Sequence, residues 1–119
     1  MKKTLIIGAT NNPSRYASLA AHRLKANGHE IINVGIKSGD VAGIPIEKAK
    51  KIHTDVDTIT LYVGPQRQEE YFDYIKKTKP KRIIFNPGTE NAELESLAKE
   101  QGIETMEACT LVLLSTGQY

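Results

Sequence analysis

Residues 5–16 read Leu5-Ile6-Ile7-Gly8-Ala9-Thr10-Asn11-Asn12-Pro13-Ser14-Arg15-Tyr16. Three large aliphatic side chains in succession, with no polar residue between them, indicate a strand buried on both faces of a parallel sheet. Gly8 ends the strand, and a short polar loop leads to Pro13, which suits the first position of a helix because no backbone N–H is needed there. Asn12 is the expected N-cap. The stretch predicts a buried strand followed directly by a helix.

This first helix is predicted to run from Pro13 to about Ala26. Asn27 and Gly28 follow it and provide the usual end signal. Apolar side chains recur on one face at helical spacing, namely at Ala17, Ala20, Ala21 and Leu24. We expect this face to pack on the sheet.

The alternation of strand and helix continues along the chain. Apolar runs predict further strands over Glu30–Val34, Thr58–Val63, Arg82–Asn86 and Ile103–Met106. Helices are predicted over Gln66–Lys77, which Pro65 opens and Pro80 ends, and over Ala92–Gln101. A short extended piece around residues 44–46 and a helical turn over Glu47–His53 are also expected.

Strands that alternate with helices require right-handed crossovers between parallel strands. The sequence therefore predicts an α/β fold: a three-layer, Rossmann-like, doubly wound and mainly parallel sheet forming a single domain over residues 1–119. In such sheets ligands bind outside the carboxyl ends of the strands. Any ligand-binding side chains should follow the strands directly.

Length and composition narrow the classes of function. A chain of 119 residues is long enough for one sheet between helices but too short for a cofactor domain plus a substrate domain. Charged residues make up 25% and hydrophobic residues 39%, which argues against both a disordered chain and a membrane protein. A net charge of +2 is too small to indicate nucleic-acid binding.

The cysteine count and the N-terminal sequence give an expectation for the cellular compartment. Cys109 has no partner within the chain, so a reducing environment is expected. The apolar stretch before Gly8 is too short for a signal peptide, and the run Leu111–Leu114 is far shorter than a bilayer span. We expect a cytoplasmic protein with no membrane partner.

The turn after the first strand has the features of a phosphate site. Gly8 allows a sharp turn, and the small Ala9 and Thr10 let a ligand approach the main chain. The start of the helix offers unpaired N–H groups and a positive dipole end, and Arg15 adds a guanidinium group. The G-x-G-x-x-G fingerprint is absent, since Thr10 stands in place of the second glycine. An ordinary strand-to-helix turn remains the alternative.

The end of the second strand bears on the kind of nucleotide. NAD-binding domains usually place an acidic residue there to accept hydrogen bonds from the ribose hydroxyls. This chain has Val34-Gly35-Ile36-Lys37 and no acid before Asp40. Lys37 suits a phosphorylated ribose, either the 2′-phosphate of NADP or the 3′-phosphate of coenzyme A, and a plain surface lysine is the alternative.

The stretch Asn86-Pro87-Gly88-Thr89 follows a later strand at the same expected edge. Its amides and the Thr89 hydroxyl could meet the pantetheine arm or a second ligand, and turn chemistry alone explains it equally well. Thr89 or Asn91 could instead cap the helix that begins near Ala92.

Together these residues resemble the small stand-alone CoA-binding domain proteins, which are related to the nucleotide-binding domain of succinyl-CoA synthetases. The resemblance covers nearly the whole chain. It rests on Gly8-Ala9-Thr10 with Pro13 and Arg15, on Val34–Lys37, on Val56-Asp57 before the strand leading to Pro65, and on Asn86–Asn91. The chain departs from many relatives at Gly35-Ile36, where they have Asn-Pro, and at Glu107–Thr110, where they have Arg-Cys-Pro.

The resemblance implies a Rossmann domain that binds coenzyme A, with the pyrophosphate at the start of the first helix and the adenine end near the second strand. By this resemblance Gly8, Thr10, Pro13 and Arg15 surround phosphate, and Lys37 lies near the phosphorylated ribose. The full set of candidate binding residues is Gly8, Ala9, Thr10, Asn11, Asn12, Pro13, Arg15, Tyr16, Gly35, Lys37, Pro65, Asn86, Pro87 and Gly88.

No set of catalytic side chains stands out in the sequence. Cys109 lacks an identifiable base, the histidines and the cysteine lack the spacing of a metal site, and His53 lies in the segment that is hardest to assign. The favoured function is a binding module for coenzyme A or acyl-CoA without chemistry of its own. An NADP-binding reductase subunit or redox sensor, and a small acyl-CoA enzyme using His53 or Cys109, are the alternatives. Assembly into a homo-oligomer stays open.

Overall fold

The computed structural model describes residues 1–119 as one seven-stranded sheet flanked by helices. The strands are β1 (Thr4–Ile7), β2 (Ile31–Val34), β3 (Asp40–Val41), β4 (Ile44–Glu47), β5 (Thr58–Leu61), β6 (Arg82–Phe85) and β7 (Glu104–Glu107). The helices are α1 (Tyr16–Ala26), α2 (Pro65–Gln68), the 3₁₀ turn η1 (Glu69–Tyr71), α3 (Phe72–Thr78), α4 (Ala92–Glu100) and α5 (Thr110–Ser115). None of the helices has the length and apolar character that a membrane span requires.

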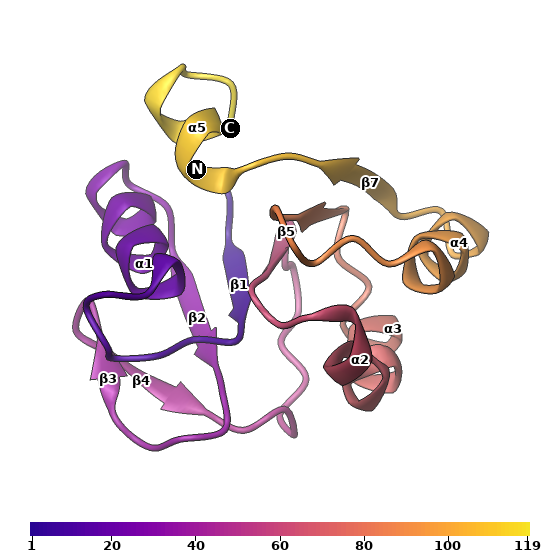
Figure 1. The fold of residues 1–119 in the computed structure, drawn as a ribbon, viewed down its shortest axis with the longest axis horizontal. Coiled ribbons are helices and arrows are strands. Elements are labelled where there is room, and N and C mark those ends of the chain that lie inside the picture. Colours follow the sequence, from indigo (N-terminus) through magenta and orange to yellow (C-terminus); the bar gives the residue numbers. More distant parts are fainter.

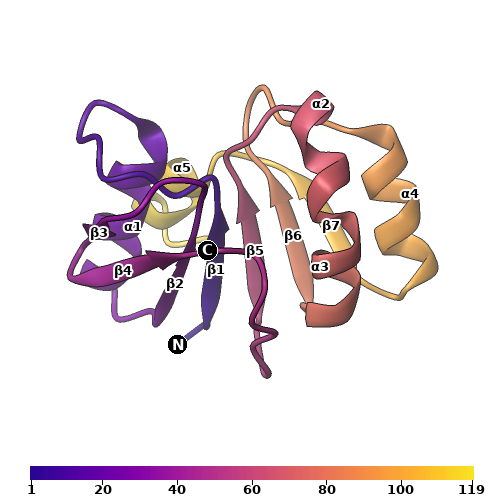
Figure 2. The same ribbon diagram turned by 90° about the horizontal axis from the view of Figure 1, so that it is seen from below.

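The strand order confirms the doubly wound fold. The sheet runs β3-β4-β2-β1-β5-β6-β7, and every neighbouring pair is parallel except β3 with β4. The chain leaves β1 toward β2 on one side and later returns to place β5 on the other side (Figure 2). The winding direction therefore reverses between β1 and β5, and this switch point is where a ligand site is expected.

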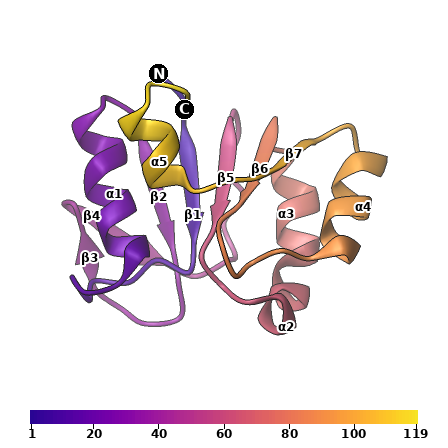
Figure 3. The ribbon, with the colours of Figure 1, turned by 45° about the horizontal axis from the view of Figure 1, so that its top comes forward.

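The helices divide between the two faces of the sheet. Helices α1 and α5 cover one face, and α2, α3 and α4 cover the other (Figures 1 and 3). Every side chain of β1, β2, β5 and β6 is buried, because helices or connecting segments cover both faces of these central strands. The two apolar clusters follow the alternation along β1, with Ile6 on the α1 face and Leu5 and Ile7 on the α3 face.

The first helix begins later than the sequence predicts. Helix α1 starts at Tyr16 rather than at Pro13, and Arg15 occupies the N-cap position in an extended conformation. The physical reason is the side chain of Asn12, whose Oδ1 accepts hydrogen bonds from the N–H and the hydroxyl of Ser14 at 3.0 and 2.7 Å. Asn12 therefore closes a separate turn instead of capping the helix.

Other boundaries also differ from the predictions. The segment Glu47–His53 forms no helix, and the helix predicted over Gln66–Lys77 is interrupted by the 3₁₀ turn η1. The predicted strands shift by one or two residues at their ends. The short hairpin partner β3 and the helix α5 have no counterpart in the predictions.

Candidate functional site

A cleft opens at the carboxyl ends of the parallel strands, above the switch point. Its cavity volume is about 540 Å³, and the loops after β1, β2, β5 and β6 all contribute to its walls. The lining residues are Gly8, Ala9, Thr10, Asn11, Asn12, Arg15, Tyr16, Ala17, Gly35, Ile36, Lys37, Tyr62, Val63, Gly64, Arg67, Tyr71, Pro87, Gly88 and Thr89. The fold thus brings together segments that lie up to about eighty residues apart in the sequence.

Gly8 and Gly35 line the cleft at positions where neighbouring backbone leaves no room for a side chain. Gly8 has a φ of +96°, and a Cβ atom there would lie 2.9 Å from the main-chain carbon and oxygen of Tyr62. A Cβ atom on Gly35 would lie 2.4 Å from the carbonyl oxygen of Ala9. The turns after β1, β2 and β5 therefore pack directly against one another.

The main-chain N–H groups near the start of α1 are partly occupied and partly open. Gly8 and Ala9 both donate to the carbonyl oxygen of Val34 at 2.9 Å, so these two groups are used within the sheet. The remaining N–H groups that donate no hydrogen bond in the protein belong to Thr10, Asn11, Tyr16 and Ala17, all of which line the cleft. They leave a cluster of donors where the dipole of α1 is positive, which is an arrangement suited to an anion.

The charged side chains of the cleft are all cationic. Arg15, Lys37 and Arg67 line it, and no aspartate or glutamate does. None of the three forms an ion pair. Outside the lining, the ammonium group of Lys48 donates to the carbonyl oxygen of Ile36 and adds a further positive charge behind the loop that carries Lys37. The local field therefore favours a polyanionic ligand.

The wall formed after β5 and β6 is held by the fully buried side chain of Gln68. Its Nε2 donates to the carbonyl oxygens of Val63 at 3.0 Å and Thr89 at 2.7 Å, and its Oε1 accepts from Asn91 Nδ2 at 3.0 Å. Asn91 also caps α4 by accepting from two N–H groups of its first turn. These contacts fix two loops and two helices relative to one another, so this wall is pre-formed.

Three of the candidate binding residues do not line the cleft. Asn86 is buried, where it donates to Thr60 Oγ1 at 2.7 Å and to the Leu61 carbonyl at 2.8 Å and accepts from the Thr110 N–H at 2.9 Å. Its amide is therefore fully used in joining β5, β6 and α5. Pro13 and Pro65 lie in segments beside the cleft without contributing to its walls.

The other candidates meet in the cleft, together with residues that the sequence reasoning missed. Those expected and found there are Gly8, Ala9, Thr10, Asn11, Asn12, Arg15, Tyr16, Gly35, Lys37, Pro87 and Gly88. The main omissions are Ile36, Tyr62, Val63, Gly64, Arg67 and Tyr71. Most of these follow β5 directly, so the rule that ligands bind beyond the carboxyl ends of strands would have pointed to them.

Tyr62 lies at the edge of the cleft with its hydroxyl directed into the protein. The hydroxyl is buried and has no hydrogen-bond partner, and burial raises the pKa of Tyr62 to about 12. Thr60 and Thr110 lie near this hydroxyl and hydrogen-bond to each other at 2.8 Å. Tyr62 therefore stays protonated at neutral pH and presents an uncharged surface.

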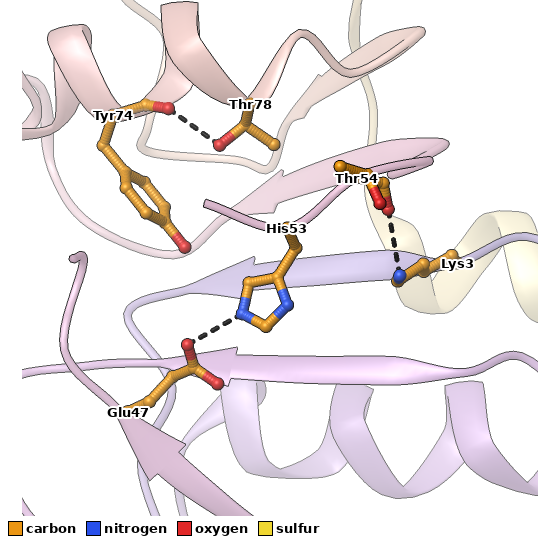
Figure 4. Close-up of polar contacts among 6 residues, drawn as sticks. All are labelled: Lys3, Glu47, His53, Thr54, Tyr74 and Thr78. Carbon is orange, nitrogen blue, oxygen red and sulfur yellow. Dashed lines mark hydrogen bonds and ion pairs between the residues drawn. The ribbon is translucent and has the colours of Figure 1, made fainter. Parts of the chain in front are cut away.

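The histidine and the cysteine considered for catalysis lie outside the cleft. His53 Nε2 contacts Glu47 Oε2 at 2.8 Å, and the buried Tyr74 hydroxyl points toward this pair (Figure 4). Burial, assisted by the charge of Glu47, raises the pKa of Tyr74 to about 12. Cys109 is half-buried at the N-cap of α5. The His53–Glu47 contact joins β4 to the segment that leads into β5.

The sheet order and the position of the cleft define the class of protein: an α/β domain of the Rossmann type whose cleft lies at the switch point, where proteins of this class bind their ligands. No group of histidine, cysteine and carboxylate side chains has the arrangement of a metal site. Residues 2–115 match the family of CoA binding domains, and the chain belongs to this family.

Solved structures share this fold. The crystal structure of an uncharacterized protein is 55% identical, with a TM-score of 0.98, and the match covers 100% of this chain and 98% of that one. A hypothetical protein from Pyrococcus horikoshii OT3 is 25% identical over 97% of this chain and 82% of its own, with a TM-score of 0.89.

A larger enzyme contains the same fold as part of its chain. The dinucleotide-forming acetyl-coenzyme A synthetase 1 of Ca. Korarchaeum cryptofilum, solved with phosphate and ADP, is 18% identical, with a TM-score of 0.68. The match covers 90% of this chain and 25% of the synthetase. At this identity the likeness concerns the fold alone. A comparison with curated proteins found no match.

Proposed function

We propose that this protein binds coenzyme A or an acyl-CoA in the cleft and acts as a binding module without chemistry of its own. Membership of the family of CoA binding domains supports coenzyme A as the ligand. The observation that carries the proposal is the cleft itself, in which open main-chain N–H groups and cationic side chains gather and no carboxylate opposes a polyanion.

In the proposed binding mode the pyrophosphate lies at the start of α1. The N–H groups of Thr10, Asn11, Tyr16 and Ala17 donate to it, and Arg15 adds a charge-assisted hydrogen bond. The phosphorylated ribose lies beyond β2 near Lys37. The pantetheine arm then crosses the switch point toward the wall formed after β5 and β6.

The proposal of a module without chemistry rests on the side chains that line the cleft. They include no histidine, cysteine or carboxylate, which are among the commonest nucleophiles and proton-transfer groups. Burial raises the pKa values of Tyr62 and Tyr71, so that the deprotonated form, which could act as a base, is harder to form. His53 and Cys109 lie elsewhere, so a small acyl-CoA enzyme that uses them gains no support from the geometry.

Isothermal titration with coenzyme A and NADP⁺ in parallel tests the ligand assignment. We expect one molecule of coenzyme A to bind per chain and NADP⁺ to bind more weakly, because the family match favours the former. Mass spectrometry of the ligand that co-purifies with the native protein is an independent test. Tighter binding of NADP⁺, or no measurable binding of coenzyme A, would contradict the proposal.

A further inference from the structure

One cation of the cleft has no role in the proposed binding of the coenzyme A phosphates. Arg15 and Lys37 follow β1 and β2, whereas Arg67 lies on the opposite wall, in the short helix α2 after β5. Arg67 forms no ion pair, and its side chain donates no hydrogen bond within the protein. The guanidinium group is therefore available to a ligand.

In the proposed binding mode, the acyl end of a bound thioester lies on the wall that carries Arg67. With the ribose phosphate near Lys37 and the pyrophosphate at the start of α1, the rest of the ligand has to cross β1 toward β5 and β6. The remaining wall consists of Tyr62, Tyr71, Gly88 and their neighbours. Coenzyme A itself has no anionic group at this end of the molecule.

The surroundings of Arg67 suit a carboxylate. The N–H groups of Val63 and Gly64, which line the same wall, donate no hydrogen bond in the protein. The adjacent Gln68 anchors α2 to both loops, so the backbone that carries Arg67 is fixed. Glu90 lies at the rim, where it accepts from the Gly88 N–H at 3.0 Å, and does not line the cleft.

We infer that the cleft selects CoA thioesters whose acyl group ends in a carboxylate, and that Arg67 binds this carboxylate. The inference rests on the proposed binding of coenzyme A. A guanidinium group binds a carboxylate through two parallel hydrogen bonds, which an uncharged acyl group of the same length does not form. Arg67 is thus the specificity-determining residue for the acyl group.

Titration of the intact protein with succinyl-CoA, butyryl-CoA and free coenzyme A tests the inference. Succinyl and butyryl groups have similar length and differ in the terminal carboxylate. We expect wild-type protein to bind succinyl-CoA about tenfold more tightly than butyryl-CoA, consistent with a charge-assisted contact. Arg67→Gln should abolish this preference, so that the affinity for succinyl-CoA falls about tenfold further than the affinities for butyryl-CoA and free coenzyme A. Arg67→Lys should retain part of the preference.

The control is Arg23→Gln, which removes an exposed arginine on α1 outside the cleft and should leave all three affinities unchanged. Equal affinity of wild-type protein for the two thioesters would overturn the inference. A loss that Arg67→Gln produces equally for all three ligands would also overturn it, because Arg67 would then bind phosphate. Failure of free coenzyme A to bind would instead refute the proposed function, and the inference would fall with it.

Discussion

Lys37 lies where the cleft would meet the phosphorylated ribose of coenzyme A. Its side chain is exposed and forms no ion pair. Lys37 lies two residues after Gly35, the glycine that packs against the carbonyl oxygen of Ala9. The carbonyl oxygen of Ile36 is held by Lys48, so the backbone next to Lys37 is anchored. In the proposed binding mode, Lys37 is the side chain that contacts the 3′-phosphate.

Replacing Lys37 by alanine should weaken coenzyme A binding by about 1–3 kcal/mol, the range for a hydrogen bond between charged groups. Dephospho-coenzyme A lacks the 3′-phosphate, so its affinity should be nearly the same for wild-type protein and Lys37→Ala. Isothermal titration of both ligands measures this difference. Lys51→Ala, which removes an exposed lysine outside the cleft, is the control. Equal affinity of wild-type protein for the two ligands would remove Lys37 from the binding mode.

His29 makes the stability of the fold depend on pH. Its Nδ1 accepts a hydrogen bond from the Lys2 N–H at 3.0 Å, which requires this nitrogen to be unprotonated. Burial, assisted by the charges of the N-terminus, Lys2 and Arg82, lowers the pKa of His29 below its ordinary value of 6.5. The unfolded chain therefore takes up a proton on His29 more readily than the folded protein does.

The expected consequence is a loss of stability as the pH falls through 6.5 toward the lower pKa of the folded state. Urea unfolding at a series of pH values measures the free energy of unfolding across this window. His29→Gln should reduce the pH dependence, and His22→Gln, at an exposed position on α1, should leave it unchanged. An identical pH dependence in wild-type protein and His29→Gln would show that another group is responsible.

Among the structural elements, α1 begins without a side-chain N-cap at the place where the phosphate site is proposed. Arg15 is at the N-cap in the extended conformation typical of that position, but its guanidinium group has no acceptor and leaves the N–H groups of the first turn uncapped. Serine is a preferred N-cap residue because its hydroxyl accepts from an N–H of the first turn. In the proposed binding mode, Arg15 serves the phosphate at this position in place of a capping residue.

Arg15→Ser should therefore stabilise the protein by about 1 kcal/mol while weakening coenzyme A binding. The serine hydroxyl would accept from an N–H of the first turn, which withdraws that donor from the proposed phosphate site, and the guanidinium group would also be lost. Chemical denaturation and isothermal titration measure the two effects separately. Arg15→Ala should lose affinity without the gain in stability. Undiminished coenzyme A affinity of Arg15→Ser would show that Arg15 does not contact the ligand.

Most elements of this fold could be predicted because their signals are local. The run Leu5–Ile7 is entirely apolar, and the run Arg82–Phe85 is apolar after Arg82. Both therefore indicate strands without tertiary information. The start of α1 could not be found in this way, since an asparagine at position 12 can either cap a helix or close a separate turn, and only the structure shows that it closes a turn. The four apolar residues of Leu111–Leu114 are too few to show helical periodicity, so α5 was missed.

The candidate site was predictable in part for the same reason. Glycines and cations that directly follow β1 and β2 stand out in the sequence, and the structure places them in the cleft. Which N–H groups are open depends on the pairing of Gly8 and Ala9 with Val34, a contact across the sheet. The anchoring role of Gln68 likewise depends on two loops that only the fold brings together.

At the scale of the whole molecule, the reversal of strand order between β1 and β5 creates the cleft. The chain leaves these strands toward opposite faces of the sheet, where α1 and α2 lie (Figure 3). Residues from both loops line the cleft. Both walls carry cations, with Arg15 and Lys37 on one side and Arg67 on the other. A long ligand with its anionic groups at separate points fits this division.

Backbone NMR during titration with coenzyme A tests the central claim most directly. If the pyrophosphate accepts from the open N–H groups, the amide resonances of Thr10, Asn11, Tyr16 and Ala17 should shift most on saturation. Those of Gly8 and Ala9, which already bond to Val34, should shift less. Saturation with coenzyme A that leaves the four open amides unperturbed, while resonances elsewhere move, would contradict the proposed site.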